Sequence, residues 1–279
     1  MKELTDKHFK ARLIHLAPIA TSLFFGFICS FLILESSLRL YSVTPFPESP
    51  EGSIGNALYF LVLIVIGATI LLTLVRMKSM KLIVVFTGMA LCIAVFFLSI
   101  VYLSALSVIT VPIRIEAIIA VAVFLTASSL YLIFKTSSRA SNLIILMIGG
   151  GLGAFLGASI QTLSAVAILC FLAVYDIFAV YRGPVGKIAD HGLENLRGLS
   201  FSFKEVQMGL GDLTFYSMLA GHMFINFGII ACITSSAGIL AGCYLVLRML
   251  EKRRMLPGLP FPISLGLASG FLPVFLLGL

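Results

Sequence analysis

Long apolar runs separated by short polar segments dominate this 279-residue chain. A helix needs about 20 mostly apolar residues to cross the roughly 30 Å hydrocarbon core of a bilayer. Nine runs have this length or come close to it, at residues 13–34, 54–75, 82–103, 115–134, 143–160, 163–181, 207–231, 233–250 and 258–279. Lipid offers the backbone no hydrogen-bond partner, so each run is expected to be helical. The pattern predicts an all-α integral membrane protein with nine transmembrane helices.

The composition supports a membrane location. Hydrophobic residues make up 60% of the chain and charged residues only 11%, whereas soluble domains carry about 25% charged residues. So much apolar surface cannot be hidden in water, which makes the lipid bilayer the expected surroundings. The net charge of +7 is accordingly interpreted as a signal of topology, and no nucleic-acid partner is expected.

Basic residues are distributed very unevenly between the two sides that nine spans define. Seventeen of the nineteen Lys and Arg residues lie on one side, in the segment before residue 13 and within 76–81, 135–139, 182–204 and 248–254. The other side holds only Arg39 and Arg114. Because cytoplasmic loops are enriched in Lys and Arg, this distribution predicts a multi-pass protein of the cell membrane with a cytoplasmic N-terminus and its C-terminus outside.

The spans group into two sets around one long polar connection. Residues 1–182 contain the first six predicted helices, residues 183–206 form a cytoplasmic loop, and residues 207–279 contain helices seven to nine. Just before the seventh helix, the alternating sequence from Ser200 to Gln207 indicates a short strand. Such a strand could pair with an extended segment of another chain, although an ordinary loop also fits the sequence.

Two of the twelve acids, Asp176 and Asp212, are placed well inside predicted spans, while the others lie in loops, tails or at span edges. Each is expected about six residues, or roughly 9 Å, from the cytoplasmic end of its helix. A carboxylate in the membrane interior costs about 2.5–3.5 kcal/mol even on the lenient insertion scale. No Lys or Arg lies in the interior of a predicted span to offset that cost, so the two acids are candidate functional residues.

Charge and depth alone leave three interpretations open. Two carboxyls about 3 Å apart cannot both ionise, so neighbouring helices would hold them as a pair that shares one proton. Such a pair can accept a proton from water and donate one to a carbonyl, as aspartic peptide hydrolysis requires. The same residues could couple protons or cations to transport, or could be two separately hydrogen-bonded structural acids.

Local sequence narrows this choice. Three short motifs stand in the sixth, seventh and ninth predicted spans, in that order: Tyr175-Asp176, Gly209-Leu210-Gly211-Asp212 and Pro257-Gly258-Leu259. They resemble the Tyr-Asp, Gly-x-Gly-Asp and Pro-Ala-Leu motifs of the presenilin and signal peptide peptidase family of intramembrane aspartyl proteases. That family has nine spans, so the resemblance covers the whole chain.

The resemblance implies an intramembrane aspartyl endopeptidase with Asp176 and Asp212 as its catalytic pair. The remaining residues of the three motifs would support the active site. The implied substrates are proteins with a transmembrane helix, and the implied chemistry uses water without a cofactor. A proton- or cation-coupled transporter that uses the same two aspartates is the alternative.

This chain departs from the family pattern in two places. Gly258 stands where the family usually has alanine, and only 35 residues separate the two aspartates. The short connection resembles signal peptide peptidases and implies a protease active as one uncut chain. The predicted cytoplasmic N-terminus resembles presenilins, which implies substrates whose own N-terminus is outside. A homo-oligomer is left open.

Several glycines and both span histidines require an interpretation. Gly149, Gly153 and Gly157 recur every four residues, which favours close helix packing, with a role in substrate passage as the alternative. Gly209 and Gly211 are expected to allow close backbone approach or a positive φ beside Asp212. His15 and His222 lack partners at ligand spacing, so no metal site is expected.

Overall fold

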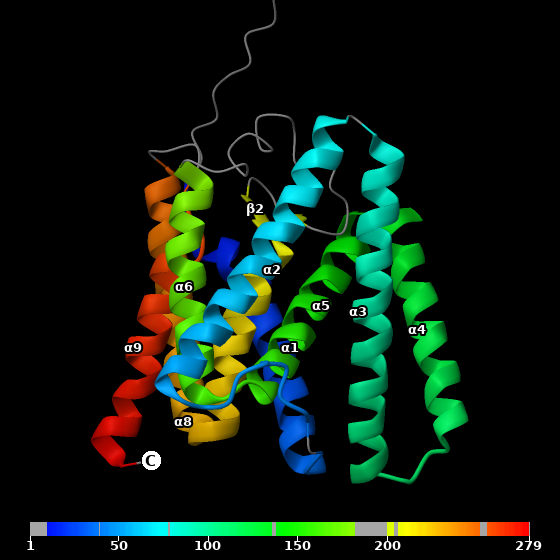
Figure 1. Ribbon diagram of the computed structural model, residues 1–279, viewed down its shortest axis with the longest axis horizontal. Coiled ribbons are helices and arrows are strands. Elements are labelled where there is room, and N and C mark those ends of the chain that lie inside the picture. The colour runs from blue at the N-terminus through cyan, green and yellow to red at the C-terminus, as the bar shows by residue number, and fades with distance from the viewer. Residues whose placement is uncertain are drawn as a thin grey trace, which may run out of the picture.

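The computed structural model describes residues 10–38, 40–77, 79–135, 138–181, 200–203, 206–251 and 256–278. Figure 1 shows an elongated bundle of helices with a small hairpin at one end. Its elements are η1 (Leu13–Leu16), α1 (Ala17–Ser36), α2 (Pro50–Arg76), α3 (Met80–Ile109), α4 (Ile115–Lys135), α5 (Ser138–Ser159), α6 (Thr162–Tyr181), β1 (Ser200–Phe203), β2 (Val206–Gly209), α8 (Leu210–Leu250) and α9 (Pro260–Leu277).

Every predicted apolar run corresponds to helix in the described part of the chain. Seven helices are long and apolar enough to cross a membrane, and α9 is a shorter apolar helix. The ends differ by several residues in places: α3 continues to Ile109, and α5 begins at Ser138. Polar residues next to an apolar run still favour helical hydrogen bonding, which hydropathy alone does not detect. The protein is therefore an all-helical membrane protein apart from its small hairpin.

Helix α8 folds back on itself at Gly228. Its 41 residues would extend about 60 Å if straight, roughly twice the thickness of the hydrocarbon core. Gly228 has φ 86° and ψ −177°, a backbone region that is accessible essentially only to glycine. Tyr216 in the first half contacts Cys243 in the second, and Figure 1 shows the two halves running in opposite directions.

The predicted break between runs 207–231 and 233–250 is therefore about four residues too late. Hydropathy does not mark the turn, because apart from Asn226 the residues next to Gly228 are apolar. What permits the turn is the backbone freedom of the glycine.

A two-stranded antiparallel hairpin precedes α8. Ser200 pairs with Gly209, and Phe203 pairs with Val206. The alternation between Ser200 and Gln207 thus marks real extended backbone, but it forms two strands where a single one was expected. One consequence is that the seventh helix begins at Leu210 and not at residue 207, because the preceding residues pair with β1.

The first half of α8 occupies the centre of the core. It packs against α1, α5 and α9, and its fully buried side chains include Leu213, Tyr216, Met218, Leu219 and Met223. Figure 1 shows α3 and α4 to one side, beyond α5. The bundle thus surrounds the helix that begins with the Gly-x-Gly-Asp motif.

Candidate active site

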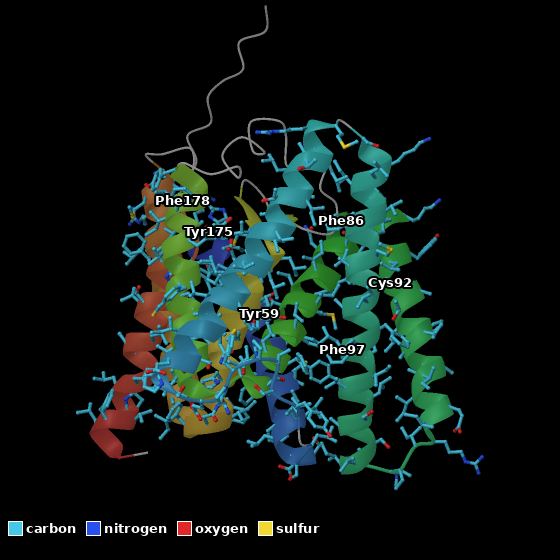
Figure 2. All side chains as sticks on the ribbon, viewed as in Figure 1. Tyr59, Phe86, Cys92, Phe97, Tyr175 and Phe178 are labelled. Atoms are coloured by element: carbon cyan, nitrogen blue, oxygen red, sulfur yellow. The ribbon has the colours of Figure 1, made fainter. Side chains whose placement is uncertain are left out.

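Asp176 lies near the end of α6 that is adjacent to the hairpin. Figure 2 labels its neighbour Tyr175 at that end of the helix. The Asp176 Oδ2 atom accepts a hydrogen bond of 2.9 Å from the backbone N–H of Leu259. The N–H of Gly258 also donates to this carboxyl. The turn between α8 and α9 therefore supplies backbone donors to an acid on α6.

Asp212 lies in the first turn of α8. Gly209 is the N-cap of the helix, so Asp212 is the third helical residue, and its carboxyl accepts a hydrogen bond from the Gly209 N–H. This is one half of a capping box, and the positive end of the helix dipole also favours a negative group here. The predicted depth of six residues is wrong for Asp212, because β2 occupies the residues assigned to the start of the span.

The two carboxyls converge on the Pro257–Leu259 turn. A Cβ atom placed on Gly258 would lie 3.0 Å from Asp212 Oδ2, while the next residue, Leu259, donates to Asp176. Asp212 on α8 also lies close enough to Asp176 on α6 to experience its charge. Both side chains are only partly buried. The three predicted motifs therefore meet at one place.

The expected role of the glycines beside Asp212 is wrong in its backbone detail. Gly209 has φ −76°, and Gly211 is not among the positive-φ glycines of the described residues. The atoms nearest to a Cβ placed on Gly209 are 3.9 Å away, and the same holds for Gly211. A methyl on either glycine would make only ordinary van der Waals contact, and the close approach to Asp212 occurs at Gly258.

The other predicted site residues lie around this centre. Tyr175 is half-buried next to Asp176. Among the described residues, its hydroxyl does not donate a hydrogen bond to either aspartate. Leu210 packs toward α5, where its side chain faces Gly149. Pro257 is buried at the start of the turn.

Two residues that the sequence reasoning missed complete the centre. The Tyr216 hydroxyl donates a hydrogen bond of 2.8 Å to the Gly258 carbonyl and contacts the Cys243 thiol. Tyr216 follows Asp212 by four residues, so both lie on one face of α8. That spacing could have identified Tyr216 from the sequence, whereas Cys243 required knowledge of the turn at Gly228.

The glycine repeat of α5 supports the helix that carries Asp212. A Cβ on Gly149 would lie 2.9 Å from the Leu213 side chain, and one on Gly157 would lie 2.6 Å from the Met218 carbonyl oxygen. The backbones of α5 and α8 are thus in direct contact, which confirms the predicted close packing. The contact fixes the position of the part of α8 that directly follows its first turn.

Chemically, the centre consists of two carboxyls from different helices and backbone donors from a third segment. Such an arrangement can bind a water molecule between the carboxyls and exchange protons with it. The class of protein that it defines is a membrane-embedded aspartyl hydrolase.

The sequence matches two related families over consecutive regions. Residues 23–189 match the family described as signal-peptide peptidase, presenilin aspartyl protease. Residues 187–278 match the presenilin family. The chain therefore belongs to the signal-peptide peptidase and presenilin family of aspartyl proteases. The transporter alternative receives no support from these matches.

Similar proteins agree with this assignment. The chain is 32% identical over 126 residues to Presenilin-B of Dictyostelium discoideum, which is 39% of this chain and 26% of that relative. The chain thus spans about a quarter of the length of that relative. Two solved structures of a presenilin family intramembrane aspartate protease, in C222 and P2 crystal forms, share the fold. Their TM-scores are 0.68 and 0.69 at 20% and 21% identity, over 94% and 96% of this chain and 98% and 100% of theirs.

Replacing Gly157 tests the contact between α5 and α8. The added methyl of Gly157→Ala would lie 2.6 Å from the Met218 carbonyl oxygen and 2.8 Å from the His222 nitrogen, both backbone atoms. Overpacking of this kind typically costs about 1–3 kcal/mol, so we expect a lower unfolding temperature in detergent. Gly88→Ala is the control, because its methyl would lie 3.6 Å from the Phe134 ring. Equal stability of the two variants would contradict the packing described.

Proposed function

We propose that this chain hydrolyses peptide bonds within transmembrane helices, with Asp176 and Asp212 as its catalytic pair. The observation that carries the proposal is the convergence of these two carboxyls on the Pro257–Leu259 turn, where backbone N–H groups donate to Asp176. A purely structural acid needs hydrogen-bond partners, but it does not need a second acid nearby. Placing the acids together raises the free energy of ionising them. A role in proton exchange with a substrate would explain why the two acids are nevertheless neighbours.

The proposed reaction is a direct attack by water. One carboxylate accepts a proton from the water as its oxygen bonds to the scissile carbonyl carbon, and the other carboxyl donates a proton to the carbonyl oxygen. The carbon–nitrogen bond of the resulting tetrahedral intermediate then breaks. The carboxyl that took the proton from water gives it to the nitrogen, and a hydroxyl of the intermediate returns a proton to the other carboxylate. The products are a free amine and a free carboxyl group, and the pair is back in its starting state. No covalent enzyme intermediate and no cofactor takes part.

Access from the bilayer is proposed along the exposed face of α6. Val174, Ile177 and Phe178, which surround Asp176 in sequence, are 43–68% exposed. Helix α2 is held to α6 far from this position, by a hydrogen bond of 2.9 Å from Asn56 to Ser164. A substrate helix could therefore reach the aspartates from the lipid without unfolding the bundle.

The hairpin is proposed as the docking site for the unwound part of the substrate. The carbonyls of a transmembrane helix are engaged in its own hydrogen bonds, so cleavage requires local unwinding. The strand β2 ends at Gly209, directly before the turn of helix that contains Asp212. A substrate segment paired with an edge of this hairpin would be extended next to the carboxyls.

We further propose nine spans, with the two halves of α8 as the seventh and eighth. The N-terminus is then cytoplasmic and the C-terminus outside, as the distribution of Lys and Arg indicates. Residues 1–182 would carry the first aspartate and residues 207–279 the second, joined by a cytoplasmic segment at 183–206. Every group invoked in the reaction lies on one chain, so the proposed active form is a single uncut chain in the cell membrane.

Replacing either aspartate tests the catalytic proposal. Asp176→Asn and Asp212→Asn preserve side-chain size but remove the exchangeable proton, and each should lower cleavage of a single-span reporter by at least about 100-fold. Mass spectrometry should locate the cuts made by the parent inside the apolar segment. Glu116→Gln, at the exposed start of α4, is the matched control. Full activity of either Asn variant would refute the pair, and activity found only after cleavage within 183–206 would refute the uncut form.

A proline in the hairpin tests its proposed role in docking. Phe203→Pro removes one backbone N–H from β1 and should reduce cleavage of a helical reporter by about tenfold or more while the protein remains folded. Phe203→Val keeps the N–H and serves as the control. A reporter peptide too polar to form a helix should be affected less. Unchanged cleavage of the helical reporter by Phe203→Pro would rule out the docking role.

Cysteine labelling tests the topology. A membrane-impermeant maleimide should label Ser42→Cys and Gly278→Cys in intact cells, and Lys135→Cys only after the membrane is opened. All three positions are exposed, whereas the five native cysteines are within helices. If α8 crossed the membrane once, Gly278→Cys would be protected together with Lys135→Cys. That result would exclude nine spans.

A further inference from the structure

The Gly258–Leu259 segment forms hydrogen bonds in two directions. Its N–H groups donate to Asp176 on α6. Its Gly258 carbonyl accepts a bond of 2.8 Å from the Tyr216 hydroxyl on α8. The segment is therefore tied on one side to the helix of the first aspartate and on the other to the helix of the second.

Tyr216 is well placed to fix this segment. Its side chain is 1% exposed, and it lies one helical turn after Asp212. Its hydroxyl contacts the Cys243 thiol from the returning half of α8. A hydrogen bond so far from water is costly to leave unmade, because neither the hydroxyl nor the carbonyl can find solvent instead.

The segment also lies directly against Asp212. A methyl on Gly258 would lie 3.0 Å from Asp212 Oδ2, 3.3 Å from its carboxyl carbon and 3.5 Å from the Tyr216 hydroxyl. These distances leave little freedom, since a shift of a few tenths of an ångström would alter the space available to the Asp212 carboxyl. The position of this turn and the position of the carboxyl are thus mechanically linked.

We infer that Tyr216 is a positioning residue. It holds the Pro257–Leu259 turn in the position that keeps the carboxyls of Asp176 and Asp212 at the separation that catalysis requires. This inference rests on the proposed function, because it assigns Tyr216 an effect on a reaction of those two aspartates. Tyr216 does not exchange protons with substrate; it acts through the Gly258 carbonyl. Its loss should therefore slow turnover without weakening the binding of a substrate helix.

A purely structural role for Tyr216 makes a different prediction. The ring of Tyr216 packs in the core with residues of α8 and α9, and phenylalanine would preserve that packing. If only packing mattered, Tyr216→Phe would leave kcat and KM unchanged. If the hydroxyl mattered only for folding, the variant would lose folded protein, and the molecules that remained folded would turn over normally.

The test compares steady-state cleavage of one single-span reporter by the parent, Tyr216→Phe, Gly258→Ala and the double variant. Rates are expressed per folded enzyme molecule. Loss of one buried hydrogen bond corresponds to about tenfold in rate, so kcat of Tyr216→Phe should fall by about that factor with KM within twofold of the parent. Tyr131→Phe, exposed on α4, is the matched control and should behave as the parent.

The double variant determines whether Tyr216 acts through the turn. Gly258→Ala is expected to lower kcat as well, because its methyl would lie 3.0 Å from Asp212 Oδ2. A Gly258→Ala variant as fast as the parent would mean that the turn does not limit the Asp212 carboxyl, which would overturn the inference. If both changes disturb the same contact, the double variant should be no slower than the slower single variant. If the two reductions in kcat multiplied in the double variant, Tyr216 would act through some other contact, and the inference would be overturned.

The remaining outcomes separate the two proposals. Suppose that the parent cuts the reporter and that Tyr216→Phe has the same kcat, differing from the parent at most in KM or in the fraction of folded protein. The positioning role is then wrong, and the protease assignment stands. If the parent and every variant fail to cut across several reporters while remaining folded, the proposed function fails, and the positioning role fails with it.

Discussion

The need to stabilise two carboxyls held close together governs the arrangement of this protein. No basic residue of the described spans is bonded to them; their hydrogen-bond donors are backbone N–H groups of Gly209, Gly258 and Leu259. Backbone donors suit this purpose, since they carry no full charge that would hold a carboxylate permanently ionised. A lysine or arginine partner would satisfy each acid better and would also remove it from proton exchange.

Using backbone donors places strict demands on the path of the chain. An N–H is free to donate only where the main chain is not in a helix or sheet, at a helix N-terminus or in a turn. The structure meets this condition twice, with the start of α8 beside one acid and the turn before α9 beside the other. Both points must be held rigidly, which explains why the α8 backbone is packed against the glycines of α5 and why Gly228 returns the chain to the same end.

Much of this could be predicted from the sequence, because the strongest constraints act on composition. Lipid selects long apolar helices, and the cost of an acid in lipid singles out Asp176 and Asp212 without any structural knowledge. The close packing at Gly157 followed from a repeat of small residues. In each case one local pattern has only a few physical explanations.

Other features depend on contacts between distant segments and left no local pattern. The turn at Gly228 looks like continuous apolar helix. The first turn of α8 was expected to lie further inside a span, because hydropathy does not separate β2 from the helix that follows it. The importance of Gly258 lies in its distance from Asp212 and Tyr216, which only the folded chain defines. Gly209 and Gly211 were expected to need backbone freedom or close approach, whereas a methyl on either would make only ordinary van der Waals contact.

The order of these parts along the chain has a consequence for biosynthesis. Asp176 and Asp212 are synthesised well before the Pro257–Leu259 turn that donates to Asp176 and limits the space around Asp212. A growing chain inserted up to the end of α8 already contains both acids but lacks the segment that sets their spacing. Hydrolytic competence would then arise only once the Pro257–Leu259 turn and α9 are in place. Neighbouring nascent helices in the same membrane would be safe from cleavage until that segment is inserted.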